Sequence, residues 1–594
     1  FEKYKNEIDE ATKQGRTVIA CMCNNEVKSL NFEIKDTDKV TLLDTSTKDG
    51  HRIYIRGILY IMAKALEESY PTALLSVNYQ LANAMFCKIE NMEITEEMIQ
   101  KIEARMQEII DQNLEIRKVE MDKEEAKEFY RNTKSQRGMA QFDNYQKEMV
   151  SLYYCENYYN YFFGVMPIST GYTNVFDIKK YKDGFLVRYP AASNPHELSN
   201  QRSGKKLLAT LEEYEDIHKV LNIHNLYNLN NEIEKGNGKD IILLSEALHE
   251  KKIADIADDI LHRKGIKMVL IAGPSSSGKT TFAKRLGIQL RLNGFKPVTI
   301  SVDNYFVERK DNPRDENGNY DFECLEAIDL DLFNNHIKTL LEGGTIDVPT
   351  FDFKVGTKCY NGEKMHLADD EILVIEGIHC LNDKLTSSIP MEQKYKIYIS
   401  DLTVLNIDYC NRISTTDTRL IRRIVRDNSY RGYSALHTLK SWDSVNRGEF
   451  KNIFPFQENC DAMFNSSLIY EFSVLKKHAL PLLEEITNEE PEYAEAKRLE
   501  EFICEHCGQH VPKLGYSCRN HCPYCLYSKH VDVNPGDRQE ECHGELEPVG
   551  AEIDSKKGYV IIFKCKKCGK IRRNKAAEDD NMDLIIKLTA MHNY

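Results

Sequence analysis

The stretch Lys267–Arg285, KMVLIAGPSSSGKTTFAKR, decides the fold. Its first part, Met268–Ala272, is an apolar run with the length and β-branched character of a buried parallel strand. The run leads into GPSSSGKT, residues 273–280, which fits the phosphate-binding pattern GxxxxGK[ST], and a helix is expected from Thr281. Because a strand precedes the pattern and a helix follows it, a chance match in a Gly/Ser turn is the weaker interpretation. The sequence therefore predicts a nucleoside triphosphate site.

Each residue type in this loop has a chemical reason. Glycines allow the tight turn that aims backbone N–H groups at phosphate oxygens, and the following helix adds its N-terminal donors and dipole. A lysine side chain brings a positive charge to the outer phosphates, and a threonine hydroxyl is a suitable Mg²⁺ ligand. The predicted nucleotide-binding residues are Gly273, Pro274, Ser275, Ser276, Ser277, Gly278, Lys279, Thr280 and Thr281.

Size and composition indicate an ordinary multidomain protein. With 594 residues, the chain has room for about three or four domains. Its net charge of −14 argues against extensive coating of nucleic acid, although it allows a local basic patch. No apolar run has membrane-spanning length, and the first residues, FEKYKNEIDE, do not resemble a signal peptide. We therefore expect a cytoplasmic protein without a membrane segment.

Further strands carry acidic residues at their ends. A strand over Val298–Val302 ends at Asp303, and a strand over Glu371–Ile375 ends at Glu376. Ligands bind at the carboxyl edge of parallel sheets, so Asp303 is placed to accept a hydroxyl proton and Glu376 to hold Mg²⁺. The alternative for Asp303 is a residue that only caps a turn.

An arginine-rich helix lies between two more strand candidates, Lys396–Ser400 and Ala462–Tyr470. Strands that alternate with helices predict an α/β fold with a doubly wound parallel sheet. The segment DTRLIRRIVRDNSYRG places several arginines on one side of a helix, and Asn428-Ser429 predicts a break that would make a mobile lid. Arginines over a triphosphate would neutralise charge in the transition state, whereas the alternative is a solvated face. The cluster consists of Arg419, Arg422, Arg423, Arg426 and Arg431.

Six segments resemble the uridine kinase and phosphoribulokinase family of P-loop kinases, in the same order. They are GPSSSGKTT, SVDNYF, YDFECLEAIDLDLF, VPTFDF, VIEGIH and RLIRRIVRD, and the resemblance spans residues 265–485. It implies an ATP- and Mg²⁺-dependent kinase domain. By the same resemblance the catalytic residues would be Asp303 as general base with Lys279, Arg426 and Arg431; Thr280 and Glu376 would hold Mg²⁺, and Glu323, Phe351 and Arg423 would bind the acceptor.

Two positions depart from the uridine kinase pattern. Those kinases contact the pyrimidine with a Tyr and a His, and the equivalent positions here are Phe351 and Gly356. An aromatic face for stacking is retained, but two polar contacts to the base are lost, and a site without them discriminates poorly. Nucleoside phosphorylation is therefore favoured, without an assignment of the base.

The amino-terminal third resembles threonyl-tRNA synthetases. The segments NNEVKSLNFEI, DGHRIYIRGILYIMAKALEESYP and TEEMIQKIEARMQEIIDQNLEI carry the resemblance, with helices expected over Arg56–Ser69 and Glu96–Asp111. It implies a partial ubiquitin-like TGS domain over residues 1–50, whose first hairpin is absent, and an α+β editing-like domain over residues 51–240. The family's HxxxH pair is replaced by Arg56 and Tyr60, and the nearby His51 is expected to be a surface residue. This departure argues against editing chemistry and leaves RNA contact open.

Two neighbouring segments have less distinctive patterns. Residues 115–137 are highly charged and predict a solvated helix and linker. The tyrosine-dense stretch Ser151–Gly164 could stack nucleic-acid bases, but aromatic side chains in a core or a domain seam are the favoured interpretation.

The carboxy-terminal part, residues 501–594, has the pattern of a zinc module. Two CxxC pairs, Cys504/Cys507 and Cys522/Cys525, have the spacing of a tetrahedral Zn²⁺ site. A second site is left open: Cys542, Cys565 and Cys568 need a fourth ligand, for which His530 is preferred over Cys518, His521 and His543. The run RNHCPYCLYSKHVDVNPGDR resembles the small bacterial RNHCP domain, which implies a structural zinc.

Together these features predict a kinase that transfers the γ-phosphoryl group of ATP to the 5′-hydroxyl of a nucleoside. The alternatives are a kinase for another sugar or polyol, and an RNA-binding regulator that uses the P-loop domain as a nucleotide switch. RNA contact through the amino-terminal and zinc modules, and oligomer formation, are left open.

Overall fold

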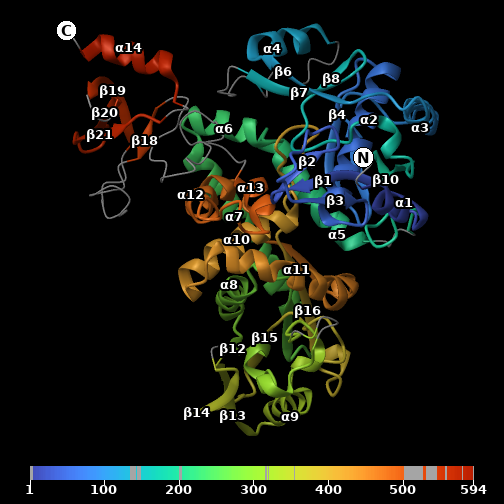
Figure 1. Cartoon of the computed structure of the whole chain (residues 1–594). Helices are drawn as coiled ribbons and strands as arrows, with labels where there is room; N and C mark the ends of the chain where they lie inside the picture. The colour runs from blue at the N-terminus through green and yellow to red at the C-terminus, as the bar shows by residue number, and fades with distance from the viewer. Residues whose placement is uncertain are drawn as a thin grey trace. The chain divides into compact units, whose positions relative to one another are not determined.

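The computed structural model describes residues 4–133, 142, 149–199, 204–314, 318, 320–352, 355–500, 526–529, 545–554, 558–577 and 580–592. The chain divides into two compact units (Figure 1). The first contains Phe1–Leu114 and Val165–Tyr493, and the second contains Glu115–Gly164 and Ala494–Tyr594.

A five-stranded parallel sheet forms the centre of the first unit, in the order β12-β15-β11-β16-β17. The strand bounds are β11 (Met268–Ala272), β12 (Lys296–Ser301), β15 (Glu371–Glu376), β16 (Lys394–Ser400) and β17 (Ala462–Asn465). All residues of β11 and β16 are buried. Burial on both faces is what a parallel sheet covered by helices requires, so the predicted α/β fold with a parallel sheet is confirmed.

Helices cover both faces of this sheet. Successive residues of β11 point to opposite sides, so Val269 packs in a cluster with Phe282 and Leu286 of α8, while Leu270 packs in a cluster with Phe333 of α9. The helices of this region are α7 (Gly238–His262), α8 (Lys279–Leu292), α9 (Leu330–Leu341), α10 (Thr415–Arg431), α11 (Ala435–Asn452) and α12 (Glu471–Leu483). A hairpin, β13 (Thr345–Asp352) and β14 (Thr357–His366), extends from the same region.

The predicted break in the arginine-rich helix is wrong. Helix α10 runs without interruption through Asn428 and Ser429. Its Ser414 side chain accepts a hydrogen bond from the Thr416 N–H at the start, and Gly432 ends it with a φ of +69°. Caps at both ends therefore outweigh the weak helix propensity of an Asn-Ser pair.

The amino-terminal part of the first unit contains two antiparallel sheets. Three strands of the first residues form the sheet β2-β1-β3, and the hairpin around Lys182 belongs to the four-stranded sheet β4-β5-β10-β9. Helix α2 begins at Lys48, earlier than expected, because the Thr47 hydroxyl caps it by accepting from the Gly50 N–H. The bounds are α1 (Lys5–Lys13), β1 (Val18–Cys23), β2 (Glu26–Ser29), β3 (Val40–Asp44), α2 (Lys48–Ser69), β4 (Leu75–Gln80), β5 (Ala84–Ile89), α3 (Glu96–Asp111), β9 (Asp177–Tyr181), β10 (Gly184–Arg188), α5 (Lys205–Val220) and α6 (Leu226–Glu234).

In the second unit the charged segment is partly a strand. Residues Arg117–Asp122 form β6, which pairs with β7, so the expected helix is confined to α4. The tyrosine-dense stretch forms β7 and β8, where Tyr153 and Tyr158 are buried, which favours the core interpretation over base stacking. The bounds are β6 (Arg117–Asp122), α4 (Lys123–Asn132), β7 (Met149–Cys155), β8 (Tyr158–Asn160), α13 (Tyr493–Glu500), β18 (Ser528–Lys529), β19 (Glu545–Asp554), β20 (Gly558–Cys565), β21 (Ile571–Lys575) and α14 (Met582–His592).

Among the described residues, no helix combines the length and the apolar character needed to cross a membrane.

Candidate active site

The loop between β11 and α8 has the backbone shape of a phosphate cradle. Gly273 admits no side chain, because a Cβ there would lie 1.9 Å from the Ile399 carbonyl oxygen. Gly278 has a φ of +88°, and Ser276 also adopts a positive φ, +59°. Such left-handed positions turn successive N–H groups toward one concave side, where an anion can sit. The loop leads directly into α8, which begins at Lys279, two residues before the expected start.

Polar atoms of the loop are available for a ligand. Within the part of the chain that the structure describes, the buried Ser276 and Ser277 hydroxyls have no hydrogen-bond partner. The Lys279 ammonium donates to the backbone oxygens of Gly273 at 2.9 Å and Pro274 at 3.2 Å, which are neutral acceptors. Buried donors without partners and a cation on neutral carbonyls fit a triphosphate, which would supply the missing acceptors and negative charge.

Three oxygen-bearing side chains meet at the ends of β12, β15 and α8. The Thr280 hydroxyl donates to Glu376 Oε1 at 3.3 Å, and the Ser301 hydroxyl donates to the same oxygen at 3.3 Å. Parallel pairing of β12 with β15 places Ser301 opposite Glu376. Hydroxyl and carboxylate oxygens are the ligands that Mg²⁺ prefers, so this set fits the metal that accompanies ATP.

Asp303 lies two residues beyond the end of β12, in the 3-10 helix Val302–Tyr305. Its side chain remains accessible to solvent, yet the protein around it lowers its solvation, and together with the charge of Glu376 this raises the pKa of the Asp303 carboxyl. Lys279, Arg431 and Arg426 act in the opposite direction. These electrostatic interactions bring together all four residues to which the resemblance gives a catalytic role.

Glu323 interacts electrostatically with some of the same residues. Burial raises the pKa of its carboxyl to about 7, and the charge of Glu449 adds to this, while Arg423 and Lys279 oppose it. Asp303 also acts on the Glu323 carboxyl, so the proposed base and the proposed acceptor ligand share one electrostatic environment.

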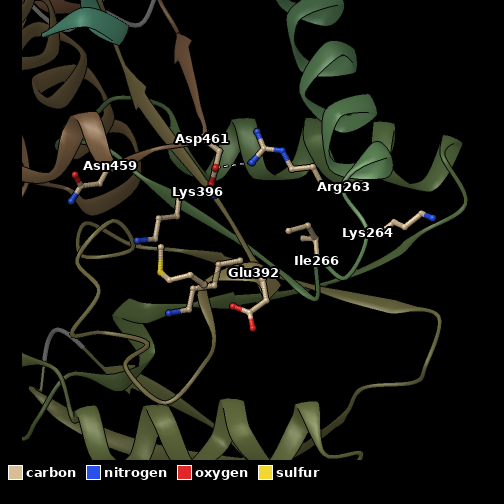
Figure 2. A pocket seen from close by; sticks show the side chains of 9 residues that line it. Arg263, Lys264, Ile266, Glu392, Lys396, Asn459 and Asp461 are labelled. Carbon is tan, nitrogen blue, oxygen red and sulfur yellow. Dashed lines mark hydrogen bonds and ion pairs between the residues drawn. The ribbon is translucent and has the colours of Figure 1, made fainter.

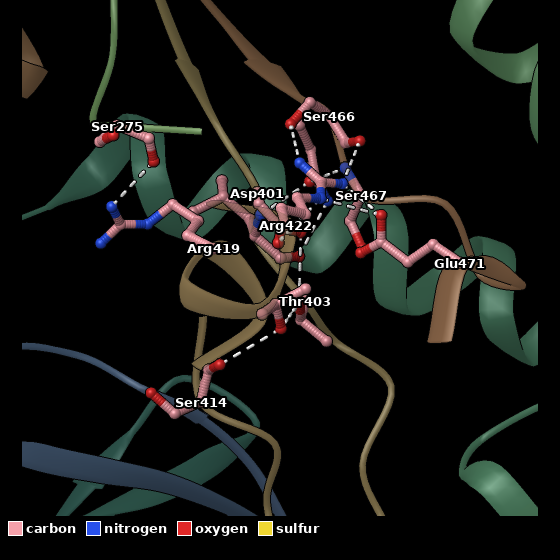
Figure 3. A network of polar contacts seen from close by, with 12 residues as sticks. Ser275, Asp401, Thr403, Ser414, Arg419, Arg422, Ser466, Ser467 and Glu471 are labelled. Atoms are coloured by element: carbon pink, nitrogen blue, oxygen red, sulfur yellow. Dashed lines mark hydrogen bonds and ion pairs between the residues drawn. The ribbon is translucent and has the colours of Figure 1, made fainter. Parts of the chain in front are cut away.

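The arginines of α10 do not all face the phosphate loop. Three of them surround one buried carboxylate: Asp427 pairs with Arg423 at 3.2 Å, Arg426 at 2.7 Å and Arg431 at 3.4 Å. The expectation that Arg422 lines the same side is wrong, because its guanidinium pairs with Glu471 and lies 3.6 Å from Asp401 (Figure 3).

Phe351 does not present an open ring. It is 6% exposed and packs in the hydrophobic core, with its ring centroid 5.5 Å from that of Phe306. At Gly356, a φ of +81° and the nearby Arg309 side chain leave little room for a larger residue. Neither position, as packed, offers a polar side chain to a ligand.

Arg56 and Tyr60, which the sequence resemblance equated with the HxxxH pair, make structural contacts. Arg56 donates to the Val165 carbonyl oxygen, and Tyr60 is completely buried. His51 is half-buried rather than a surface residue: its Nε2 lies 2.9 Å from the Pro190 oxygen, and burial lowers its pKa.

The predicted zinc ligands lie mostly outside the described residues. This applies to Cys504, Cys507, Cys522, Cys525, His530 and Cys542, and to the rival ligands. Cys565 and Cys568 are described: the first is buried, the second is exposed, and the Cys568 N–H lies 3.5 Å from Cys565 Sγ. No group of metal-ligating side chains is complete within the described part.

A cavity of about 260 Å³ is lined by residues at the amino ends of β11, β16 and β17 (Figure 2). Its lining includes Lys264, Ile266, Lys394 and Asp461. The phosphate loop lies at the carboxyl end of β11, so this cavity is not part of the candidate active site.

Three residues of the site were given no role from the sequence. Ser301 is an ordinary strand residue, Asp427 sits within a charge run, and Glu449 lies far along the chain from the loop that it contacts. The pairing of β12 with β15 shows the role of Ser301, and the packing of helices α10 and α11 shows the roles of Asp427 and Glu449.

Two family models match the chain. The phosphoribulokinase / uridine kinase family matches residues 268–468, and the RNHCP domain matches residues 499–586. The uridine kinase of Mycoplasma genitalium is 31% identical over 185 residues, 31% of this chain and 77% of the relative. That of Bacillus pumilus is 30% identical over 177 residues, 30% of this chain and 75% of the relative.

A solved structure of a possible uridine kinase from Bacillus stearothermophilus is 20% identical, with a TM-score of 0.23; the match covers 36% of this chain and 98% of that one. The relatives at 30% identity or more, each matched over three quarters of its length, agree with the sheet and the phosphate loop. Through residues 268–468 the chain therefore belongs to the phosphoribulokinase / uridine kinase family.

Proposed function

We propose that the chain is an ATP- and Mg²⁺-dependent kinase that transfers the γ-phosphoryl group to the 5′-hydroxyl of a nucleoside. The observation that carries this proposal is the position of Asp303. It lies at the carboxyl edge of the parallel sheet and interacts electrostatically with Glu376, Lys279, Arg426 and Arg431. A carboxylate among these groups is suited to accept the proton of an alcohol that attacks a phosphoryl group.

The other residues have complementary roles in this proposal. Loop residues 273–281 bind the phosphates, and Thr280 with Glu376 holds Mg²⁺, which neutralises charge on the phosphates when bound. Lys279, Arg426 and Arg431 stabilise the charge that spreads over the transferring group. Asp303 orients the acceptor hydroxyl and takes its proton, and Glu323 binds the ribose diol with its carboxylate oxygens.

The nucleobase is not assigned. Phe351 is buried and position 356 is a glycine, so neither offers a polar contact to a base. The same observation supports a second candidate, a kinase for another sugar or polyol, because the groups that contact the hydroxyls do not require a base.

The test uses the full chain with ATP, Mg²⁺ and a panel of nucleosides and sugars, and measures ADP release. We expect one nucleoside to stimulate turnover and Asp303→Asn to lower kcat by about 10²–10⁴-fold while ATP binding is unchanged. Asp347→Asn, an exposed carboxylate on β13, is the matched control. If no nucleoside stimulates ADP release, or if Asp303→Asn keeps full activity, the proposal fails.

We also propose that residues 501–594 hold structural Zn²⁺ through Cys504, Cys507, Cys522 and Cys525, with a second site at Cys542, Cys565, Cys568 and His530. The match of the RNHCP model supports the module, and the two CxxC pairs support the metal. The partial TGS and editing-like assignments of residues 1–50 and 51–240 stay proposals that rest on sequence resemblance.

A further inference from the structure

Helix α11 contacts the phosphate loop through a buried carboxylate. Glu449 is completely buried, and its Oε1 accepts a hydrogen bond from the Ser275 backbone N–H at 2.8 Å. The same oxygen pairs with Arg419 Nη1 at 2.7 Å. The third residue of the phosphate loop is thus bound by a side chain that lies 174 positions further along the sequence.

Arginines of α10 hold the rest of Ser275. Arg419, which is 2% exposed, donates to the Ser275 carbonyl oxygen at 3.2 Å (Figure 3). Arg423 donates to the Ser275 hydroxyl at 2.7 Å. The N–H, the carbonyl and the hydroxyl of one loop residue are therefore all fixed by α10 and α11.

Gly448, the residue before Glu449 on α11, lies against Glu323. A Cβ on Gly448 would lie 2.3 Å from Glu323 Cβ and 2.6 Å from Glu323 Cγ. The Glu323 side chain therefore lies directly on the helix backbone, and only a hydrogen atom fits between them. Because Gly448 lies inside a regular helix, the requirement for glycine comes from this contact and not from its backbone angles.

We infer that the Gly448-Glu449 pair of α11 positions the two halves of the site relative to each other: Glu449 holds the phosphate loop, and Gly448 sets the place of Glu323. The inference rests on the proposed function for its acceptor half, since Glu323 is given a ribose-binding role there. Both are positioning residues, because each acts through another group. Adjacent residues on one rigid helix fix the distance between the ATP-binding loop and the acceptor carboxylate.

The energetics of the buried pair favour a functional role. Removing two charges from water is costly, and a buried ion pair often contributes less to stability than apolar side chains of similar size. Moreover, Glu449 Oε2 is buried without a hydrogen-bond partner among the described residues. A pair that is expensive to bury and incompletely satisfied, yet aimed at the phosphate loop, is better explained by its contacts with Ser275 than by stability.

The contact between Glu449 and the phosphate loop is tested by ATP affinity. In Glu449→Gln and in the double variant Arg419→Met/Glu449→Leu, we expect the Kd for ATP to rise at least about tenfold, because the Ser275 N–H loses its charged acceptor. The double variant removes both charges together, so its thermal midpoint should stay close to that of the original chain. Ser444→Ala, an exposed position on α11, should change neither quantity.

A folded double variant that binds ATP with unchanged affinity would show that the pair is only structural and would overturn the inference. This experiment needs no acceptor. It therefore remains decisive for Glu449 even if no nucleoside is turned over and the proposed function fails.

The acceptor half is tested by Gly448→Ala. The added methyl group displaces Glu323, so we expect KM for the nucleoside that stimulates turnover to rise at least about tenfold, while the Kd for ATP stays within about twofold. Each of the two neighbouring substitutions should thus weaken the binding of a different substrate: ATP for Glu449→Gln and the nucleoside for Gly448→Ala. If Gly448→Ala weakens ATP and nucleoside equally, or neither, Gly448 does not set the place of Glu323.

Discussion

Glu323 shows how burial of one residue gives a measurable pH dependence. Its carboxyl has a pKa raised from 4.5 to about 7 by burial, so the folded chain binds this proton more readily than the unfolded chain does. Between pH 4.5 and 7 the folded state holds more protons, and stability therefore falls as pH rises through this window. Above pH 7, the charged Glu323 carboxylate lowers the stability of the folded state.

Glu323→Gln removes that cost. We expect the variant to be more stable than the original chain at pH 8 by about 1–3 kcal/mol, allowing for solvent at the partly exposed side of Glu323, and equal to it near pH 4. Urea unfolding at the two pH values measures the difference. Glu326→Gln, an exposed neighbour, is the control. A difference that does not change with pH would contradict the raised pKa.

At the residue scale, the sequence best predicts functional side chains that lie near the carboxyl end of a strand. Glu376 ends a strand, Asp303 lies two residues after one, and Lys279 and Thr280 follow the loop after a third. The carboxyl ends of these strands must meet at one edge, so the proximity of the four residues follows from the fold class. Glu449 could not be predicted in this way, because the contact with Ser275 depends on how α11 packs on the loop.

Among the elements, α10 depends on a single carboxylate. Asp427 is 2% exposed and pairs with three arginines, so Asp427→Asn leaves three nearby cations without their shared counterion. Because these arginines are partly exposed, we expect a loss of about 2–4 kcal/mol in the free energy of unfolding. Asp443 is an exposed residue of α11 that pairs with Lys48. Asp443→Asn should lower the free energy of unfolding by less than about 1 kcal/mol. Equal losses in the two variants would contradict a central role for Asp427.

Element boundaries follow from the sequence where periodicity and caps agree. Met268–Ala272 and Glu96–Asp111 are found as expected, since one is a continuous apolar run and the other has the Thr95 cap before an apolar stripe. The charged strand Arg117–Asp122 was missed because only one of its residues is buried and its partner β7 is distant in sequence. In such a strand, pairing outweighs the polar composition that argued for a helix.

For the molecule as a whole, the proposed zinc module gives a separate prediction. A small module with few apolar residues depends on its metal to fold, so chelation should unfold residues 501–594 and leave ATP binding intact. Zinc content by elemental analysis, before and after substitution of Cys504 and Cys522 by Ser, measures the first site. Cys359→Ser, an exposed cysteine on β14, is the control and should retain the metal. A full chain without bound zinc would contradict the proposal.

The amino-terminal and kinase parts of the first unit share hydrogen bonds through the segment between β16 and α10. Asn406 Nδ2 donates to the backbone oxygens of Val77 at 2.8 Å and Asn78 at 3.2 Å, and the Val77 N–H donates to the Tyr409 oxygen at 2.9 Å. Elsewhere in the same unit, the Tyr214 hydroxyl donates to the Asn465 oxygen at 2.9 Å. Unfolding of the amino-terminal part would therefore expose buried polar groups at the end of the kinase sheet.

Asn406→Ala tests whether these parts unfold together. Two carbonyl oxygens lose a buried donor, so we expect a loss of about 1–3 kcal/mol in the free energy of unfolding. Because the parts share one interface, hydrogen exchange should show reduced protection of both β4 and β16, whereas Asn335→Ala, an exposed amide on α9, should change neither. Loss of protection in β4 alone would mean that the amino-terminal part opens independently. Loss in both would mean that the segment leading to the arginines of α10 is held in place by the amino-terminal part, and hence that this part contributes to the shape of the candidate active site.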